Sequence, residues 1–182
     1  MSRGIGSAVA LMLRLCLAIL LYSLPATASS NSTECQHQIP LSNDGTVITL
    51  KVRGNESITT FNVTLNRISW VAVGFSEAGM MAWPSPSKAV VFHENADGDH
   101  EVAPFLLLNQ TDAGVVPLST GAAAMHAITL LEWDATVNHA VNEVSFEFSI
   151  ATNAVAGMEY VIGAAGATTS LDIANHGSYR GS

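Results

Sequence analysis

The sequence predicts an all-β protein with the fold of an immunoglobulin-like antiparallel β-sandwich. Three features predict this fold. Apolar and polar residues alternate with a period of two over several segments, turn-forming residues separate those segments, and no long amphipathic helical pattern occurs. Of the 182 residues, 48% are hydrophobic and only 12% are charged. That balance fits one compact domain and excludes a disordered chain.

The first five expected strands are of two kinds. Residues 48–53, 61–66 and 144–150 alternate strictly, so each predicts a half-buried strand with one wet face. Residues 68–75 and 89–92 are more continuously apolar. Such runs are typical of central strands, which are covered on both faces.

Two further strands are expected at residues 126–133 and 158–162. The segments are separated by groups of Gly, Asn, Asp and Ser, which favour turns. These turn signals lie at residues 42–45, 53–55, 76–79 and 95–99.

The start of the chain has the pattern of a signal peptide, expected at residues 1–28. A basic residue is followed by an apolar run at 15–22, and Ala26-Thr27-Ala28 fits the small-residue cleavage rule. We therefore expect a mature domain at residues 29–182. The alternative is a retained membrane anchor, but Arg14 leaves an uninterrupted apolar run that is short for a span.

Four N-x-S/T sequons support a secreted, glycosylated protein: Asn31, Asn55, Asn62 and Asn109. Cleavage after residue 28 would leave Cys35 as the one cysteine of the mature chain. It is then a free thiol, an intermolecular bridge, or the partner of a cysteine outside this chain. The last two are favoured over a catalytic thiol, because no Cys/His/Asn signature surrounds it.

The charge balance excludes one class of partner. The net charge is −8, and two of the seven basic residues lie in the expected leader, which leaves five basic against fifteen acidic residues. A surface this acidic repels phosphate backbones, so nucleic-acid binding is not expected. The motifs of serine hydrolases, P-loop proteins, zinc proteases and dinucleotide-binding proteins are also missing from the sequence.

An acidic loop at residues 94–101, flanked by His93 and His100, has two interpretations. Its carboxylates could bind calcium, or the two histidines another metal, although the spacing matches no EF-hand. The favoured interpretation is a solvated hairpin turn in which Asp97-Gly98 supplies a positive φ.

Two methionines and a late histidine are the candidate metal ligands. Met80 and Met81 directly follow the segment at 68–75 and its turn, and His176 lies in a tail rich in Gly and Ser. A thioether and an imidazole form a known axial pair for haem iron. The alternatives are a methionine that fills a gap in the core and a solvated histidine.

A family resemblance favours the haem interpretation. Residues 70–81, WVAVGFSEAGMM, resemble the signature of DOMON domains, which are extracellular β-sandwiches related to the cytochrome domain of cellobiose dehydrogenase. In that family a loop Met and a His in a late loop are the axial ligands of a b-type haem. The tail at 176–182, HGSYRGS, is similar to the family's histidine segment, so the resemblance covers about residues 35–182.

The resemblance implies roles for particular residues. Counting from Ser76 places the ligand methionine at Met81 rather than Met80, with His176 as the second ligand. Trp83 would cover a haem face, the alternative being ordinary rim packing. Arg180 would pair with a haem propionate, the alternative being a solvated arginine. The step at residues 82–87 is longer than in the family, and its two prolines stiffen it.

The function implied by the resemblance is one-electron transfer by non-covalent haem b. An iron with two protein ligands has no open position for substrate, so the domain is not expected to be an enzyme itself. Relatives exchange the electron with a fused membrane b-type cytochrome or a flavin domain. The alternatives are a haem-free extracellular module that binds carbohydrate or protein, and a plain adhesion-type sandwich, because the fold alone does not prove haem.

Overall fold

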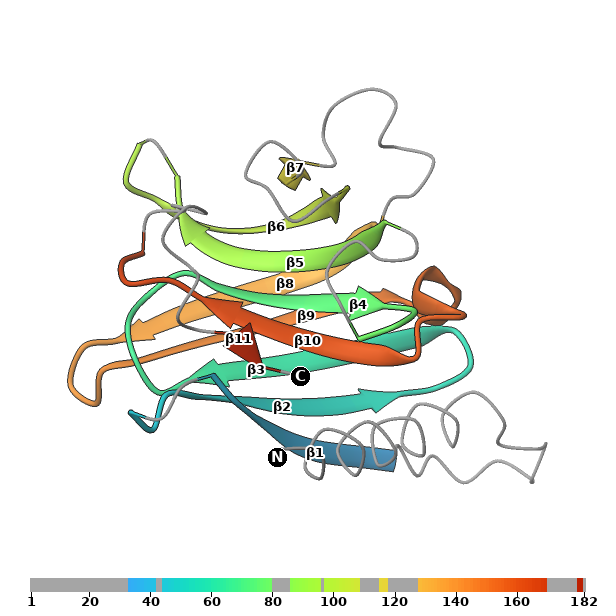
Figure 1. Ribbon diagram of the computed structural model, residues 1–182, viewed down its shortest axis with the longest axis horizontal. Helices are drawn as coiled ribbons and strands as arrows, with labels where there is room; N and C mark the ends of the chain where they lie inside the picture. Colours follow the sequence, from blue (N-terminus) through green and yellow to red (C-terminus); the bar gives the residue numbers. More distant parts are fainter. Residues whose placement is uncertain are drawn as a thin grey trace, which may run out of the picture.

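Two antiparallel β-sheets pack face to face in the computed structural model, which confirms the predicted all-β sandwich (Figure 1). The structure describes residues 33–41, 44–79, 86–95, 97–108, 115–117, 128–169 and 180–181.

The first sheet has five strands. Its strands, in spatial order, are β1 (Thr33–Pro40), β2 (Val47–Gly54), β3 (Ile58–Leu65), β9 (Glu143–Ala151) and β8 (Leu130–Asn138). The alternation predicted for β3 and β9 is seen directly, since every second residue of both strands is buried and the residues between are half-buried or, at Ile58, exposed.

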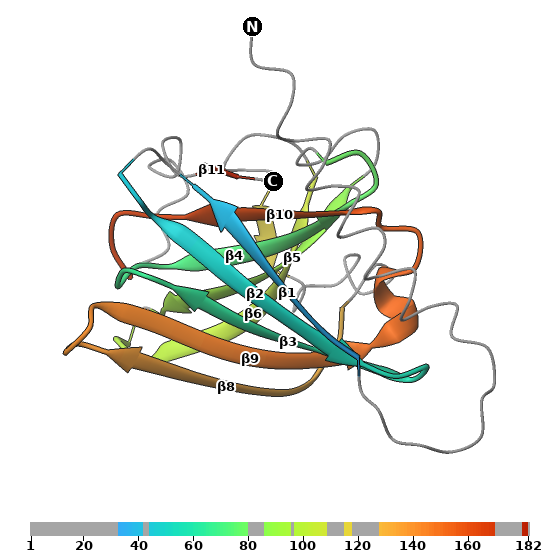
Figure 2. The same cartoon turned by 90° about the horizontal axis from the view of Figure 1, so that it is seen from below.

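The second sheet has six strands. In spatial order they are β11 (Arg180–Gly181), β10 (Tyr160–Ala165), β4 (Val71–Ser76), β5 (Ser87–Glu94), β6 (His100–Leu107) and β7 (Val115–Pro117). A short 3-10 helix, η3 (Thr152–Val155), follows β9 and leads the chain back to β10. Seen from below, β10 runs along one side of the molecule, near β1 and β11, which contact each other (Figure 2).

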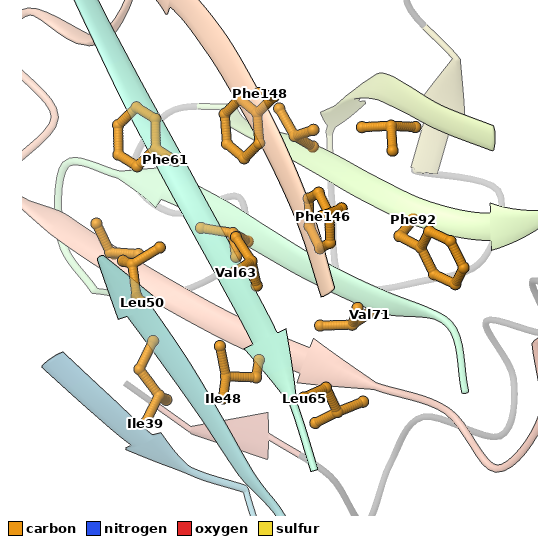
Figure 3. Packing of buried hydrophobic residues seen from close by; sticks show 14 of the residues in the cluster. Ile39, Ile48, Leu50, Phe61, Val63, Leu65, Val71, Phe92, Phe146 and Phe148 are labelled. Carbon is orange, nitrogen blue, oxygen red and sulfur yellow. The ribbon is translucent and has the colours of Figure 1, made fainter. Parts of the chain in front are cut away.

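A cluster of phenylalanines fills the space between the sheets. Phe61 of β3 stacks on Phe148 of β9, with ring centroids 5.0 Å apart, and meets Phe75 of β4 edge-on at 5.2 Å. Phe92 of β5 stacks on Phe146 of β9 at 6.1 Å. All five rings are at most 2% exposed. Figure 3 shows Phe61, Phe92, Phe146 and Phe148 with the aliphatic side chains that surround them. Aromatic contacts between the two sheets therefore fix how the sheets face each other.

The predicted strands agree with the structure where alternation was strict. β2, β3 and β9 contain residues 48–53, 61–65 and 144–150. β4 begins at Val71, later than expected, because Trp70 N donates to Thr168 O instead of joining the ladder. The segment expected at 126–133 corresponds to β8, which begins at Leu130 and runs on to Asn138; residues 126 and 127 lie outside the described residues.

The expected signal peptide and the sequons at Asn31 and Asn109 also lie outside the described residues. Within the part of the chain that the structure describes, no helix has the length and apolar character needed to cross a membrane.

Candidate functional site

The outer face of the six-stranded sheet is apolar. In a simple two-sheet sandwich this face would be exposed to water and polar. Trp70 packs with outward-facing residues of β5 and β6 in a second hydrophobic cluster, separate from the core between the sheets. Its buried members are Trp70, Ala89, Val91, Phe105 and Leu107. Both faces of β5 are thus apolar, which accounts for the continuous apolar run at 89–92.

The part of this face formed by β4 and β10 consists mainly of small residues. Ala72 is in register with Ala164, and Gly74 with Ile162. Ala72, Ile162 and Ala164 are half-buried, whereas the cluster members on β5 and β6, which are Ala89, Val91, Phe105 and Leu107, are buried. We call Ala72, Gly74, Ile162 and Ala164 the β4–β10 platform. It is flat and apolar, since three of its four side chains are a methyl group or a hydrogen.

The segment that holds His176 begins and ends at one end of this platform. Gly166 N donates to Trp70 O over 3.1 Å, and Trp70 N donates to Thr168 O over 2.7 Å. Glu94 N then donates to Thr169 O over 2.9 Å, while the Thr169 hydroxyl donates to the Glu94 carboxylate. The chain returns at Arg180, which is in register with Ala164. Residues 168 and 169 are therefore fixed to Trp70 and to the end of β5, and residue 180 is fixed to the end of β10, all at the same end of the sheet.

The segment that holds Met80 and Met81 starts at the other end of the platform. Gly79 follows β4 with φ +73°, a conformation that glycine adopts without strain. A Cβ at Gly79 would lie 3.0 Å from Tyr160 Cδ1, so the chain passes close over that ring. The segment at 80–85 connects β4 to β5, and both strands belong to the same sheet as β10 and β11.

The predicted ligands themselves are not placed. Met80, Met81, Trp83 and His176 lie outside the described residues. Arg180 lies in the two-residue strand β11 at the sheet edge, beside Ala164 of the platform. The structure thus places the anchors of both ligand segments on one sheet, and does not show the ligand atoms together.

The platform is the feature that sequence reasoning missed. The signal that could have revealed it is the loss of alternation at residues 71–75 and 89–92, where small and apolar residues occupy both parities. Such a pattern indicates not only that the strands are central but also that their outer face is apolar.

The acidic loop is a hairpin turn, in agreement with the favoured interpretation. Asn95 N donates to Asp99 O over 2.8 Å, and the Asn95 side-chain oxygen accepts from Asp97 N and Asp99 N. Gly98 has φ +86°. The His93 ring packs edge-on against Phe105, 6.0 Å away, rather than toward the loop carboxylates. Among the described residues, no three His, Cys, Asp or Glu side chains are arranged to hold a metal ion.

Two partly buried basic side chains lie away from the platform. Burial lowers the pKa of His37, on the edge strand β1, and the pKa of Lys88, on β5. Lys88 Nζ donates to Ala154 O of η3 over 2.9 Å. This bond ties the start of β5 to the helix that precedes β10.

Comparison with protein-family models, with curated proteins and with solved structures finds no match to this chain.

Proposed function

We propose that this protein is a one-electron carrier that binds haem b non-covalently over the β4–β10 platform, with Met81 and His176 as the axial ligands of the iron. The observation that carries the proposal is the apolar outer face of the six-stranded sheet. Ligand-bearing segments begin at both ends of that face.

The chemistry of the platform fits a flat, apolar macrocycle. Ala72 and Ala164 present little more than backbone and methyl groups, and the Ile162 side chain lies flat across Gly74, so a planar group can approach the sheet closely. Burying apolar surface of this kind contributes roughly 25 cal/mol for each Å² removed from water. The buried cluster around Phe105 and Val91 continues the apolar surface over β5 and β6.

The covalent reach of the chain permits the two ligands to meet. Tyr160, beside Gly79, and Ala164, beside Arg180, are four residues apart on β10, or about 13 Å along the strand. Met81 is two residues from Gly79, a reach of about 7 Å, and His176 is four residues from Arg180, a reach of about 14 Å. The two extended backbone segments together are therefore longer than the distance between Gly79 and Arg180 along β10.

The arrangement favours electron transfer over bond chemistry. When bound, haem would supply reversible one-electron exchange, and Met81 and His176 would hold its iron and leave no position for substrate. The platform residues would exclude water, and Met81 would favour the reduced state. The resemblance implies a membrane b-type cytochrome or a flavoprotein as the partner that supplies or accepts the electron.

Absorption spectroscopy during titration of the purified protein with haemin tests the proposal. We expect a Soret band that saturates at one haem per chain, and loss of the six-coordinate spectrum in Met81→Ala and in His176→Ala. Met80→Ala is the matched control and should keep the spectrum. A protein that shows no saturable Soret change contradicts the proposal and favours the haem-free binding module.

A further inference from the structure

The outer face of the five-stranded sheet is polar, unlike that of the other sheet. Lys51, Asn62 and Glu147 form one cross-strand row over β2, β3 and β9. In the neighbouring row, Arg53 is in register with Glu34 of β1. Arg53 Nη2 and Glu147 Oε1 form a salt bridge of 2.8 Å that joins the two rows diagonally.

These side chains surround a shallow hollow of about 190 Å³ on that face. It is lined by Glu34, Lys51, Val52, Arg53, Asn62 and Glu147. Two carboxylates face two basic groups, so the hollow carries no net charge. A neutral, hydroxyl-rich ligand suits this lining better than a phosphate or a metal cation does. Sites for drug-sized ligands measure roughly 300–1,000 Å³, so this hollow has room for about one sugar.

Asn62 forms part of the wall of the hollow and is the acceptor residue of a sequon. Its half-buried side chain makes no hydrogen bond to any residue that the structure describes. Thr64, the hydroxyl residue of the sequon, lies two residues on and therefore on the same face of β3. The amide nitrogen of Asn62 is thus available on the face that contains the hollow.

We propose that Asn62 carries an N-linked glycan whose first sugar lies in this hollow. The glycan comes from a lipid-linked oligosaccharide diphosphate. The amide nitrogen forms a bond to C1 of the first sugar, the bond between C1 and the diphosphate oxygen breaks, the lipid diphosphate leaves, and the amide loses a proton. The step requires the secretory route that the signal peptide predicts.

The lining can hold a sugar once it is attached. Carboxylates of Glu34 and Glu147 accept hydrogen bonds from hydroxyl groups, and Lys51 and Arg53 donate to sugar oxygens. The glycan then covers the outer face of the five-stranded sheet. The outer face of the six-stranded sheet, over which haem is proposed to bind, belongs to the other sheet and would not be covered by this sugar.

The neighbouring sequon at Asn55 provides a matched control. Asn55 is exposed in the β2–β3 turn, outside the lining of the hollow. Its side-chain oxygen accepts hydrogen bonds from Ser57 N and Ile58 N, at 2.8 and 2.9 Å. Ser57→Ala removes the Asn55 sequon but keeps both of these bonds, and Thr64→Val removes the Asn62 sequon with little change in shape.

Glycopeptide mass spectrometry of the full chain, secreted from a eukaryotic host, tests the attachment. We expect a glycan on Asn62 that is lost in Thr64→Val and kept in Ser57→Ala. Secreted protein with unmodified Asn62 would overturn the proposal. This readout does not depend on haem, so it can fail while the proposed electron-transfer function stands, and the reverse also holds.

The rate of enzymatic deglycosylation of the native protein tests the hollow. A sugar held by the lining should be released from Asn62 at least several-fold more slowly than from Asn55, and the difference should vanish after denaturation. Lys51→Ala/Arg53→Ala should raise the native rate at Asn62 alone. If Asn55 carries no glycan in this host, the rate at Asn62 in the Lys51→Ala/Arg53→Ala variant is compared directly with the rate in the unsubstituted protein. A native rate at Asn62 that the double substitution leaves unchanged overturns the placement in the hollow.

Discussion

Ile162 of β10 lies directly over Gly74 of β4 on the outer face of the six-stranded sheet. A Cβ built on Gly74 would lie 2.7 Å from Ile162 Cγ1, closer than real Cβ contacts come. The glycine therefore lets the branched side chain lie flat across the neighbouring strand, and this contact shapes the β4–β10 platform.

Gly74→Ala should destabilise the protein by about 1–3 kcal/mol, because the added methyl group forces Ile162 out of its place. Chemical denaturation of the variant measures the change in the free energy of unfolding. In a double-mutant cycle with Ile162→Ala, the combined loss should be smaller than the sum of the single losses. Strict additivity would show that the two side chains do not compete for the same space.

Gly79→Ala should cost more stability than Gly45→Ala. Both glycines have positive φ, +73° and +87°, so both substitutions bear the backbone penalty of about 1–2 kcal/mol. Only Gly79 also faces the Tyr160 ring, whereas a Cβ at Gly45 would meet nothing within 4 Å. Thermal unfolding of the two variants compares them. Equal losses would mean that the close passage over Tyr160 does not constrain the start of the methionine segment.

Mild acid should destabilise the protein through His37. This side chain faces inward on β1, in register with Leu50, and its buried Nε2 has no hydrogen-bond partner among the described residues. Burial lowers the pKa of His37 in the folded protein below the ordinary value of 6.5. As the pH falls, His37 of the unfolded chain is therefore protonated first. The stability that the protein has with neutral His37 is fully present above about pH 6.5, and it is lost progressively as the pH falls below that value.

The variant His37→Leu tests that assignment. Its free energy of unfolding should fall less between pH 7 and pH 5 than that of the unsubstituted protein. His139→Leu, in the exposed turn after β8, is the matched control and should leave the pH dependence unchanged. An identical acid response in His37→Leu and the unsubstituted protein would exclude His37 as the source.

The fold could be predicted from the sequence wherever one face of a strand is wet. β3 and β9 alternate because Phe61, Val63, Phe146 and Phe148 all point into one core. β1 was missed because it is an edge strand with few buried residues, and among its residues 34–40, whose burial the structure describes, only Ile39 is fully buried. β6 was missed because Pro104 interrupts it. Pro104 lies beyond the part of β6 that pairs with β7, so it has a paired strand on one side only, which is where a sheet tolerates proline.

The candidate site could be predicted only in part. Local motifs are sufficient to nominate Met81 and His176, because a ligand type and its neighbours are encoded in a few consecutive residues. The platform depends on the register between β4 and β10, whose residues are about ninety positions apart in the sequence. Neither strand alone shows that Ala72 faces outward beside Ala164, so this surface could be recognised only from the assembled sheet.

Iron-edge X-ray absorption of the haem-loaded protein tests the central claim most directly, because it detects the atoms bound to the metal. We expect one sulfur ligand beside the nitrogen ligands in the unsubstituted protein and in Met80→Ala, and loss of the sulfur in Met81→Ala. A haem-loaded protein whose iron has no sulfur ligand, or a chain that retains no haem at all, would contradict the account.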